Sequence, residues 1–364
     1  MQARALSGFG VLQIEPTDMC NLRCSMCRPH AEGWDSIHGV PKGFFSLELW
    51  RHIVDTFIED QVCFDHIIFQ WLGDPLLHPA LPELLQEAQR LEGKVQYLRV
   101  DSNMILLSEE RARQIVEYSL LGKIPILFVA SLDAFSEAVY TKVKGADQLR
   151  LVRKNIRRLL ALRTQYQAPI NLQVQFVVQR ENAHEVEFFK DYWLSIFRCY
   201  ARNEEETNGM VQWHDEIMFK RLSVDGGARG QSEADAIYVE HVLTKGIRAT
   251  EINGVQICVW EHEPWQNTHA KSPESTVPKP RMACPGLWST PVIRHDGMLM
   301  YCCADLDGQM PLGSLHTHRF KDLWLFSEAR TRRQQHLQGT FLDKCSQCGG
   351  INWYALPSHS VEWS

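Results

Sequence analysis

Up to about residue 222, stretches typical of strands alternate with stretches typical of helices, and this alternation constrains the fold most. Strands that alternate with helices form parallel sheets, because each helix crosses back over the sheet to reach the next strand. The expected strands cover residues 11–14, 66–69, 95–100, 124–130, 170–178 and 211–222, and the expected helices begin near residues 46, 81, 108, 147 and 183. Both a partial (β/α)6 barrel and a doubly wound sheet fit this α/β pattern, and periodicity alone does not choose between them.

The size and charge of the chain exclude several classes of protein. Its 364 residues, 45% of them hydrophobic, are enough for one large domain and a smaller one. The net charge is −6 and no basic block occurs, so we expect no nucleic-acid partner. No apolar run reaches the roughly 18–20 residues that cross a bilayer, and no signal peptide is present. We therefore expect a cytoplasmic protein with no membrane association.

Eleven cysteines are many for a cytoplasmic chain, and an odd number cannot pair completely. In such a compartment cysteines indicate metal binding or catalysis rather than disulfides. Three lie together at Cys20, Cys24 and Cys27, with the spacing C-x3-C-x2-C, after the first expected strand. Three thiolates on one loop can hold three irons of a cubane and leave the fourth iron open to a small molecule. By residue type alone, a zinc site completed by His30 is the alternative.

The region around these cysteines resembles the radical S-adenosylmethionine (SAM) superfamily, and the resemblance continues along the chain. Leu72-Gly73-Asp74-Pro75 is similar to the family's Gly-Gly-Glu-Pro motif, Ser102-Asn103 to its Thr-Asn-Gly, and Ser131-Leu132-Asp133 to its Ser-Leu-Asp. The resemblance implies a partial (β/α)6 TIM-like barrel, SAM bound to a four-iron, four-sulfur (4Fe–4S) cluster, and flavodoxin or ferredoxin as the electron donor. The residues that it implies as SAM contacts are Met26, Gly73, Asp74, Asn103, Ser131 and Asp133.

A second group of cysteines lies near the C-terminus and comprises Cys284, Cys302, Cys303, Cys345 and Cys348. By spacing alone, structural zinc and an iron–sulfur cluster both fit. The segment resembles the auxiliary-cluster domains of the SPASM and twitch subfamilies, which implies a second 4Fe–4S cluster. The family's Asp-Gly hairpin matches Asp296-Gly297 and makes Cys302, not the adjacent Cys303, the expected ligand. The expected domains are a barrel at 1–222, a connector at 223–280 and a SPASM/twitch-like domain at 281–364.

A cluster with four protein ligands is suited to transferring single electrons. We therefore predict an oxidoreductase that abstracts hydrogen from a small polar substrate and oxidises it through the auxiliary cluster. An amino sugar, an aminocyclitol or a nucleoside-like natural product is expected, because only 19 residues precede Cys20 and a leader-binding domain is expected to be absent. The alternatives are an epimerase with Cys258 as the hydrogen donor, a peptide-crosslinking enzyme, and an iron–sulfur electron carrier without catalysis.

Overall fold

A computed structural model describes residues 10–31, 36–37, 40–201, 214–222, 228–259, 283–306, 308–343 and 345. The chain divides into two compact units. The first unit comprises Met1–Met19, Asp35–Leu98 and Glu263–Ser364, and the second comprises Cys20–Trp34 and Arg99–His262. Strand β5 (Val95–Ser102) begins in the first unit and ends in the second. In each unit parallel strands are covered by helices, which confirms the predicted α/β class.

The sheet of the first unit places the ends of the parallel strands β1 and β11 side by side. Strand β1 pairs in parallel with both β4 and β11, and β12 and β13 continue the sheet as antiparallel neighbours. The carboxyl ends of β1 and β11 therefore lie at the same edge. In sheet order the strands are β13 (Pro311–Ser314), β12 (Met298–Met300), β11 (Val292–Ile293), β1 (Val11–Ile14) and β4 (Phe64–Phe69), followed by β5.

Helix α2 (Leu47–Glu59) shows how the first unit follows from its sequence. Ser46 caps its first turn by accepting a hydrogen bond from the backbone N–H of Leu49, as the sequence predicts. Trp50 is fully buried, and its indole N–H donates to the carbonyl of Leu84 in α3 (Leu81–Ala88). The remaining elements are β2 (Ser36–Ile37), β3 (Val40–Pro41), η2 (Pro75–Leu77), η3 (Gln89–Leu91), α9 (Gly286–Ser289), α10 (Phe320–Leu325) and α11 (Ser327–Leu337).

The second unit continues with parallel strands from the end of β5. Strands β6, β7, β8 and β10 are parallel, and β9 pairs antiparallel with β10. Strand β10 lies in the predicted connector, yet it extends the sheet because Val255 and Ile257 are buried. In sheet order the strands after β5 are β6 (Ile126–Ser131), β7 (Ile170–Val178), β8 (Asp215–Arg221), β10 (Val255–Val259) and β9 (Thr250–Ile252).

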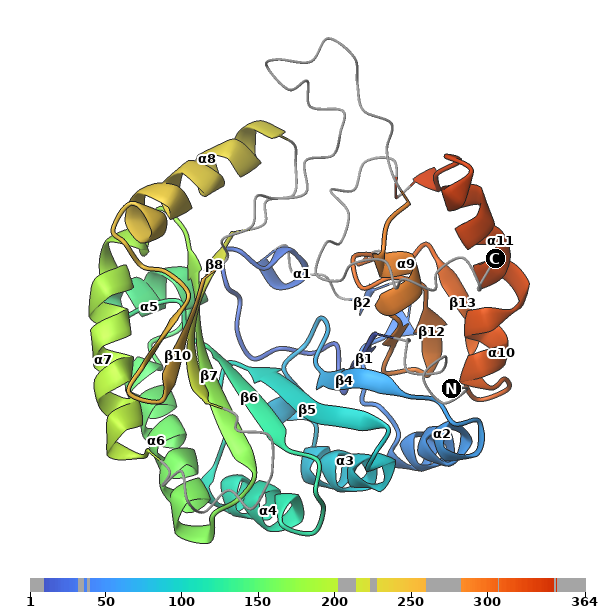
Figure 1. The fold of residues 1–364 in the computed structure, drawn as a ribbon, viewed down its shortest axis with the longest axis horizontal. Coiled ribbons are helices and arrows are strands. Elements are labelled where there is room, and N and C mark those ends of the chain that lie inside the picture. The colour runs from blue at the N-terminus through green and yellow to red at the C-terminus, as the bar shows by residue number, and fades with distance from the viewer. Residues whose placement is uncertain are drawn as a thin grey trace. The chain divides into compact units, whose positions relative to one another are not determined.

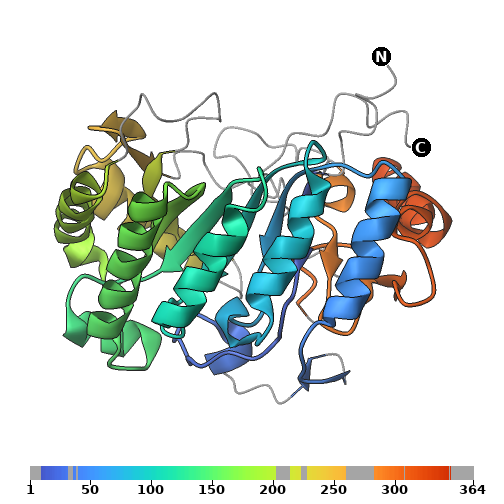
Figure 2. The same ribbon diagram turned by 90° about the horizontal axis from the view of Figure 1, so that it is seen from below.

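Helices cover one face of this sheet (Figures 1 and 2). Phe176 of β7 and Phe219 of β8 both contact Phe189 of α7, so alternate residues of these strands point to the opposite face. We call that opposite face the inner face. The helices of this layer are α4 (Glu109–Ser119), α5 (Glu137–Lys144), α6 (Leu149–Tyr166), η4 (Ala183–Glu185), α7 (Val186–Cys199), α8 (Ala228–Tyr238) and the π-helix η6 (Val239–Leu243). Helix α1 (Arg28–Ala31) does not belong to this layer.

Two further observations bear on the predicted organisation. The predicted domain bounds at 222 and 281 do not coincide with the division into two units, and they stay a prediction. Among the described residues, no helix is both long enough and apolar enough to span a membrane.

Candidate functional site

The loop that carries the first cysteines lies in the second unit and is held by its neighbours. Cys20, Cys24 and Cys27 are half-buried. The backbone N–H of Ser25 donates to the carbonyl of Val143 at 3.1 Å, which fastens the loop to the end of α5. Asn103, a predicted SAM contact, donates its side-chain N–H to the Oδ1 of Asn21 at 2.8 Å. We call residues 20–27 the cysteine loop.

A buried group of charges lies next to the cysteine loop. Lys144, the last residue of α5, is 3% exposed; its ammonium group pairs with the Asp133 carboxylate and lies 3.0 Å from the hydroxyl of Ser131. Burial raises the pKa of both Cys24 and Cys27, and the charge of Lys144 opposes that rise at each thiol. Burial lowers the pKa of Lys144, but Asp133 and Cys24 raise it above its ordinary value. Lys144 therefore stays a cation.

Asp133 has an unusual backbone conformation that hydrogen bonds to its side chain and to its carbonyl hold in place. Its φ of +58° is rare for a residue other than glycine. The turn persists because the carboxylate accepts from the N–H of Val177 at 2.6 Å and Asn182 donates to the Asp133 carbonyl at 2.8 Å. The structure thus brings the predicted residues Ser131 and Asp133 together, along with Lys144. Met26 is half-buried on the cysteine loop.

The Gly73-Asp74 motif lies in the first unit, directly against the segment that precedes the cysteine loop. A Cβ atom on Gly73 would lie 2.2 Å from the Thr17 carbonyl oxygen and 2.4 Å from that of Met19, so only glycine fits. The N–H of Asp74 donates to the Met19 carbonyl, and its carboxylate caps η2 by accepting from Leu76 N–H at 2.9 Å. Asp74 thus has a capping role, and its predicted contact with SAM stays a prediction.

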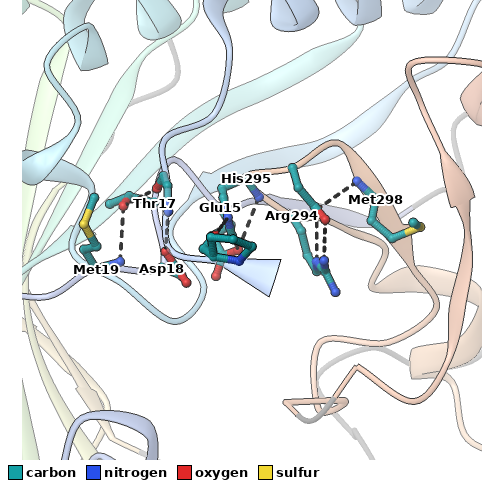
Figure 3. A network of polar contacts seen from close by, with 10 residues as sticks. Glu15, Thr17, Asp18, Met19, Arg294, His295 and Met298 are labelled. Atoms are coloured by element: carbon teal, nitrogen blue, oxygen red, sulfur yellow. Dashed lines mark hydrogen bonds and ion pairs between the residues drawn. The ribbon is translucent and has the colours of Figure 1, made fainter. Parts of the chain in front are cut away.

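A polar network follows β1 and β11 in the first unit (Figure 3). Glu15 accepts from both the backbone N–H and the Nδ1 of His295, and the His295 Nε2 lies 3.1 Å from the carbonyl of Pro41. Both ring nitrogens therefore face acceptors. Burial lowers the pKa of His295, but the hydrogen bond and charge of Glu15 raise it above its ordinary value. In the same segment, Asp18 accepts from the N–H of Gly43 at 3.1 Å.

The second group of cysteines lies in the first unit. Cys284, Cys302 and Cys345 are buried, whereas Cys348 lies outside the described residues. Strand β12 ends at Met300, so Cys302 and Cys303 occupy a turn and strand alternation does not separate them. Their thiols hydrogen-bond; this bond raises the pKa of Cys302 and lowers that of Cys303. Of the two thiols, Cys303 therefore forms a thiolate more readily. The assignment of Cys302 as the ligand stays a prediction.

The inner face of the second unit carries charged residues on neighbouring strands. Glu216 of β8 contacts the side-chain amide of Gln173, and Cys258 of β10 hydrogen-bonds to the same carboxylate. Burial and the charge of Glu216 raise the pKa of the Cys258 thiol to about 12, so this thiol keeps its proton. Burial also raises the pKa of Glu216.

Lys220 lies one inner-face position beyond Met218, toward the carboxyl end of β8. Its pKa falls to about 8, because burial and the charge of Arg99 lower it more than Asp101 and Asp133 raise it. Arg99 itself pairs with both oxygens of Asp101 on β5, at 2.6 Å each. The inner face thus combines a protonated thiol, an acid and an amine that titrates near neutral pH.

Sequence reasoning missed Lys144, Glu216, Lys220 and His295. For Glu216 and Lys220 the signal was present, because they alternate with the apolar Ile217 and Phe219 on β8. Lys144 follows Tyr140 by four residues on the buried side of a helix, and Gly145 then ends that helix. His295 had no local signal, because its partner Glu15 lies 280 residues away.

The residue types at the two sites fit the expected cofactors, although the described thiols do not lie close enough together to hold a metal ion. Among the described residues, no three His, Cys, Asp or Glu side chains are grouped closely enough to hold a metal ion. Cys24 and Cys27 nevertheless interact electrostatically, and Lys144 favours their thiolate forms, as iron ligation requires. In the first unit, Glu15 Oε1 and Asp18 Oδ2 are buried with no hydrogen-bond partner among the described residues. Such acceptors suit a cationic ligand, and SAM is a cation.

Comparison with known proteins matches both cysteine regions. The radical SAM superfamily matches residues 14–188, and the SPASM iron–sulfur cluster-binding domain matches residues 284–349. A cofactor-modifying protein for the tungsten-containing aldehyde ferredoxin oxidoreductase of Pyrococcus furiosus is 25% identical over 186 residues, which are 51% of this chain and 48% of that protein. The chain thus spans about half the length of this curated relative.

Solved structures share the fold. SuiB of Streptococcus suis superposes with a TM-score of 0.57 and 13% identity, over 94% of this chain and 71% of SuiB. The enzyme anSMEcpe with bound SAM superposes with a TM-score of 0.55 and 16% identity, over 93% of this chain and 86% of that one. At these identities the likeness shows the fold alone, and it agrees with the expected partial barrel.

Proposed function

Because the chain belongs to the radical SAM superfamily and carries a SPASM domain, we propose that it oxidises a small polar substrate after abstracting a hydrogen atom. Its cofactors are SAM, a 4Fe–4S cluster that binds SAM, and auxiliary iron–sulfur cluster binding by the C-terminal SPASM domain. The observation that supports the substrate class is the charged inner face of the second unit, with Glu216 and Lys220 on one strand. Charged groups of both signs suit an amino sugar, an aminocyclitol or a nucleoside.

The residues proposed to hold the cofactors are those that the resemblance in sequence implies. Cys20, Cys24 and Cys27 would bind the first cluster, and when SAM is bound there it supplies a 5′-deoxyadenosyl radical. Four cysteines would bind the auxiliary cluster, namely Cys284, Cys302, Cys345 and Cys348. The proposed SAM contacts are Met26, Gly73, Asp74, Asn103, Ser131 and Asp133. A flavodoxin or ferredoxin would provide the electron that starts each turnover.

We assign the role of proton acceptor to Lys220. Oxidation of an alcohol or amine carbon removes one hydrogen atom, one proton and one electron. The radical that bound SAM supplies would take the hydrogen atom, and a cluster held by the C-terminal cysteines would accept the electron. The proton of the neighbouring O–H or N–H goes to the neutral amine of Lys220. With a pKa of about 8, a useful share of Lys220 is neutral near physiological pH.

A specific observation favours a second candidate, a redox-neutral inversion. Cys258 lies on the inner face, and in the sheet register it is level with Met218 of β8 and Gln175 of β7. Burial, together with the charge and hydrogen bond of Glu216, keeps its thiol protonated, and a protonated thiol is the form that gives a hydrogen atom to a carbon radical. Cys258 would then act as the donor, and the substrate would keep its formula. The sulfur radical left on Cys258 would take one electron from the auxiliary cluster and one proton from solvent to restore the thiol.

Peptides are the remaining substrate class. SuiB is known bound to the precursor peptide SuiA, and anSMEcpe bound to the peptide Kp18Cys. An unstructured model peptide therefore belongs in the test beside the small molecules.

The test is anaerobic incubation of the reconstituted protein with SAM and C-deuterated glucosamine, scyllo-inosamine, adenosine or the model peptide. Deuterium transferred to 5′-deoxyadenosine with a product two hydrogens lighter supports oxidation of that substrate. An unchanged formula with one solvent deuterium, lost in Cys258→Ala, would establish inversion instead. Transfer from the peptide alone would overturn the small-substrate proposal, and so would SAM cleavage without transfer from any of the four.

The role of Lys220 has its own controls. Lys220→Met should still transfer deuterium but form oxidised product about 10²–10⁴-fold more slowly. The wild-type rate should rise as the pH passes through about 8, because the neutral amine is the active form. The exposed Lys245→Met variant should keep both behaviours. An unchanged rate and pH profile in Lys220→Met would exclude Lys220 as the base.

A further inference from the structure

We propose that the ammonium group of Lys144 sets the reduction potential of the cluster on the cysteine loop, by holding a fixed positive charge beside Cys24 and Cys27. The inference rests on the proposed function, because it takes these cysteines as cluster ligands. It adds an electrostatic role for a residue outside every motif that the sequence indicates.

The end of helix α5 brings this charge to the loop. Lys144 is the last residue of the helix, and Gly145 ends it in the left-handed region with a φ of +76°. A Cβ atom on Gly145 would lie 3.0 Å from the carbonyl oxygen of Arg23, so glycine allows the helix end to approach the loop. The hydrogen bond from Ser25 to the carbonyl of Val143 then fixes that approach.

The side chain of Lys144 cannot swing away from this position. It is 3% exposed and pairs with the 1% exposed Asp133, whose carboxylate is itself held by the N–H of Val177. A buried ion pair is weak evidence for stability, since an apolar pair of similar volume is often as stable. The pair is better explained by what its charge does to nearby groups.

The positive charge lies beside the cysteine loop, because the residues on either side of Lys144 contact the residues on either side of Cys24. The carbonyl of Val143 accepts from Ser25, and Gly145 approaches the carbonyl of Arg23. Reduction adds one negative charge to a cluster, and a nearby cation stabilises that charge. The net charge around a cluster is one of the factors that set its potential. Lys144 therefore makes the cluster easier to reduce.

The test is a redox titration of the reconstituted full-length chain, followed by electron paramagnetic resonance. The signal of the SAM-binding cluster is identified by its change when SAM is added. Lys144→Met should shift its midpoint potential to a more negative value, and Lys144→Arg should leave it unchanged. Lys142→Met removes the same charge from the exposed side of the same helix, and it should also leave the potential unchanged.

Other outcomes of the titration also test the role proposed for Lys144. A wild-type potential in Lys144→Met with full iron content would overturn the proposal. If Lys144→Met takes up less iron, Lys144→Gln provides a polar, uncharged replacement for the same titration. Loss of the cluster in the Met and Gln variants but not in Arg supports a role of the charge, whereas loss in Arg too would show a purely steric role. None of these readouts needs a substrate, so failure of the proposed oxidation is seen separately.

Discussion

His295 joins the strand that precedes the cysteine segment to the C-terminal part of the same unit (Figure 3). Its pKa is raised in the folded protein by Glu15, despite burial. A raised pKa contributes stability that is fully present below the unfolded pKa of about 6.5 and is lost as pH rises through the folded value. The free energy of unfolding, measured with urea, should therefore fall with rising pH above about 6.5.

Two variants check this assignment. His295→Gln should lower the free energy of unfolding by about 1–3 kcal/mol at pH 6 and weaken the pH dependence. His318→Gln, at an exposed histidine of the same unit, should change neither. An equal pH slope in His295→Gln and wild type would show that another group is responsible.

Gly73 gives a second prediction for a single residue. Alanine there would push against the carbonyl groups of Thr17 and Met19, so the backbone leading to the cysteine loop must shift. We expect Gly73→Ala to cost about 1–3 kcal/mol of stability and to weaken SAM binding at least about tenfold. Gly93→Ala also strains a glycine, at a φ of +78°, but no other atom lies within 4 Å of its Cβ. Isothermal titration with SAM should therefore distinguish the two, and equal binding would contradict the proposed role of the motif.

Among the elements, helix α6 is tied to the sheet of the second unit by one arginine. Arg163 is 1% exposed; it pairs with Asp215 of β8 at 2.5 Å and donates to the carbonyl of Tyr200 at 3.0 Å. The same Asp215 oxygen accepts from the N–H of Leu172 in β7. Removing Arg163 would leave that carboxylate, whose side chain is only 10% exposed, without a cation to pair with.

We expect Arg163→Met to lower the free energy of unfolding by about 3–5 kcal/mol. Arg150→Met removes an exposed pair with Glu137 and should cost under about 1 kcal/mol. Urea unfolding monitored by circular dichroism compares the two. Equal losses would mean that the buried pair contributes no more than a surface one.

The elements themselves were largely predictable, because their signals are local. The strand expected at residues 170–178 coincides with β7, and α4 begins at Glu109, next to its expected start near residue 108. Strands β9 and β10 were not predicted, since each is short and flanked by a segment rich in glycine and proline. A strand of five residues is recognised by its partner, and the partner β8 cannot be chosen before the sheet exists.

The candidate site was predictable only where a motif names its residues. Cys20, Gly73 and Ser131 are recognised by spacing and by their place after strands. The partners of these residues are set by the fold, as the pairing of Asp133 with Lys144 illustrates. The pairing register of β7, β8 and β10 determines which of their residues share the inner face. The proximity of Glu216, Lys220 and Cys258 could therefore be recognised only from the structure.

At the scale of the whole molecule, the two cysteine groups belong to different compact units. The cysteine loop lies in the second unit, whereas Cys284, Cys302 and Cys345 lie in the first. Ligands supplied by separate units should bind iron independently, since each site keeps its own neighbours. Loss of one group should then leave the other site able to assemble.

The reconstituted protein should be brown and contain about eight irons, from two four-iron clusters. Replacing Cys20, Cys24 and Cys27 by alanine should remove about half of the iron and abolish SAM cleavage. Replacing Cys284 and Cys345 should remove the other half, while reductive SAM cleavage persists because it needs the first cluster alone. Iron analysis and high-performance liquid chromatography of 5′-deoxyadenosine measure both effects. A colourless, zinc-containing protein would contradict the cluster assignment, and loss of all iron in either variant would show that the two sites assemble as one.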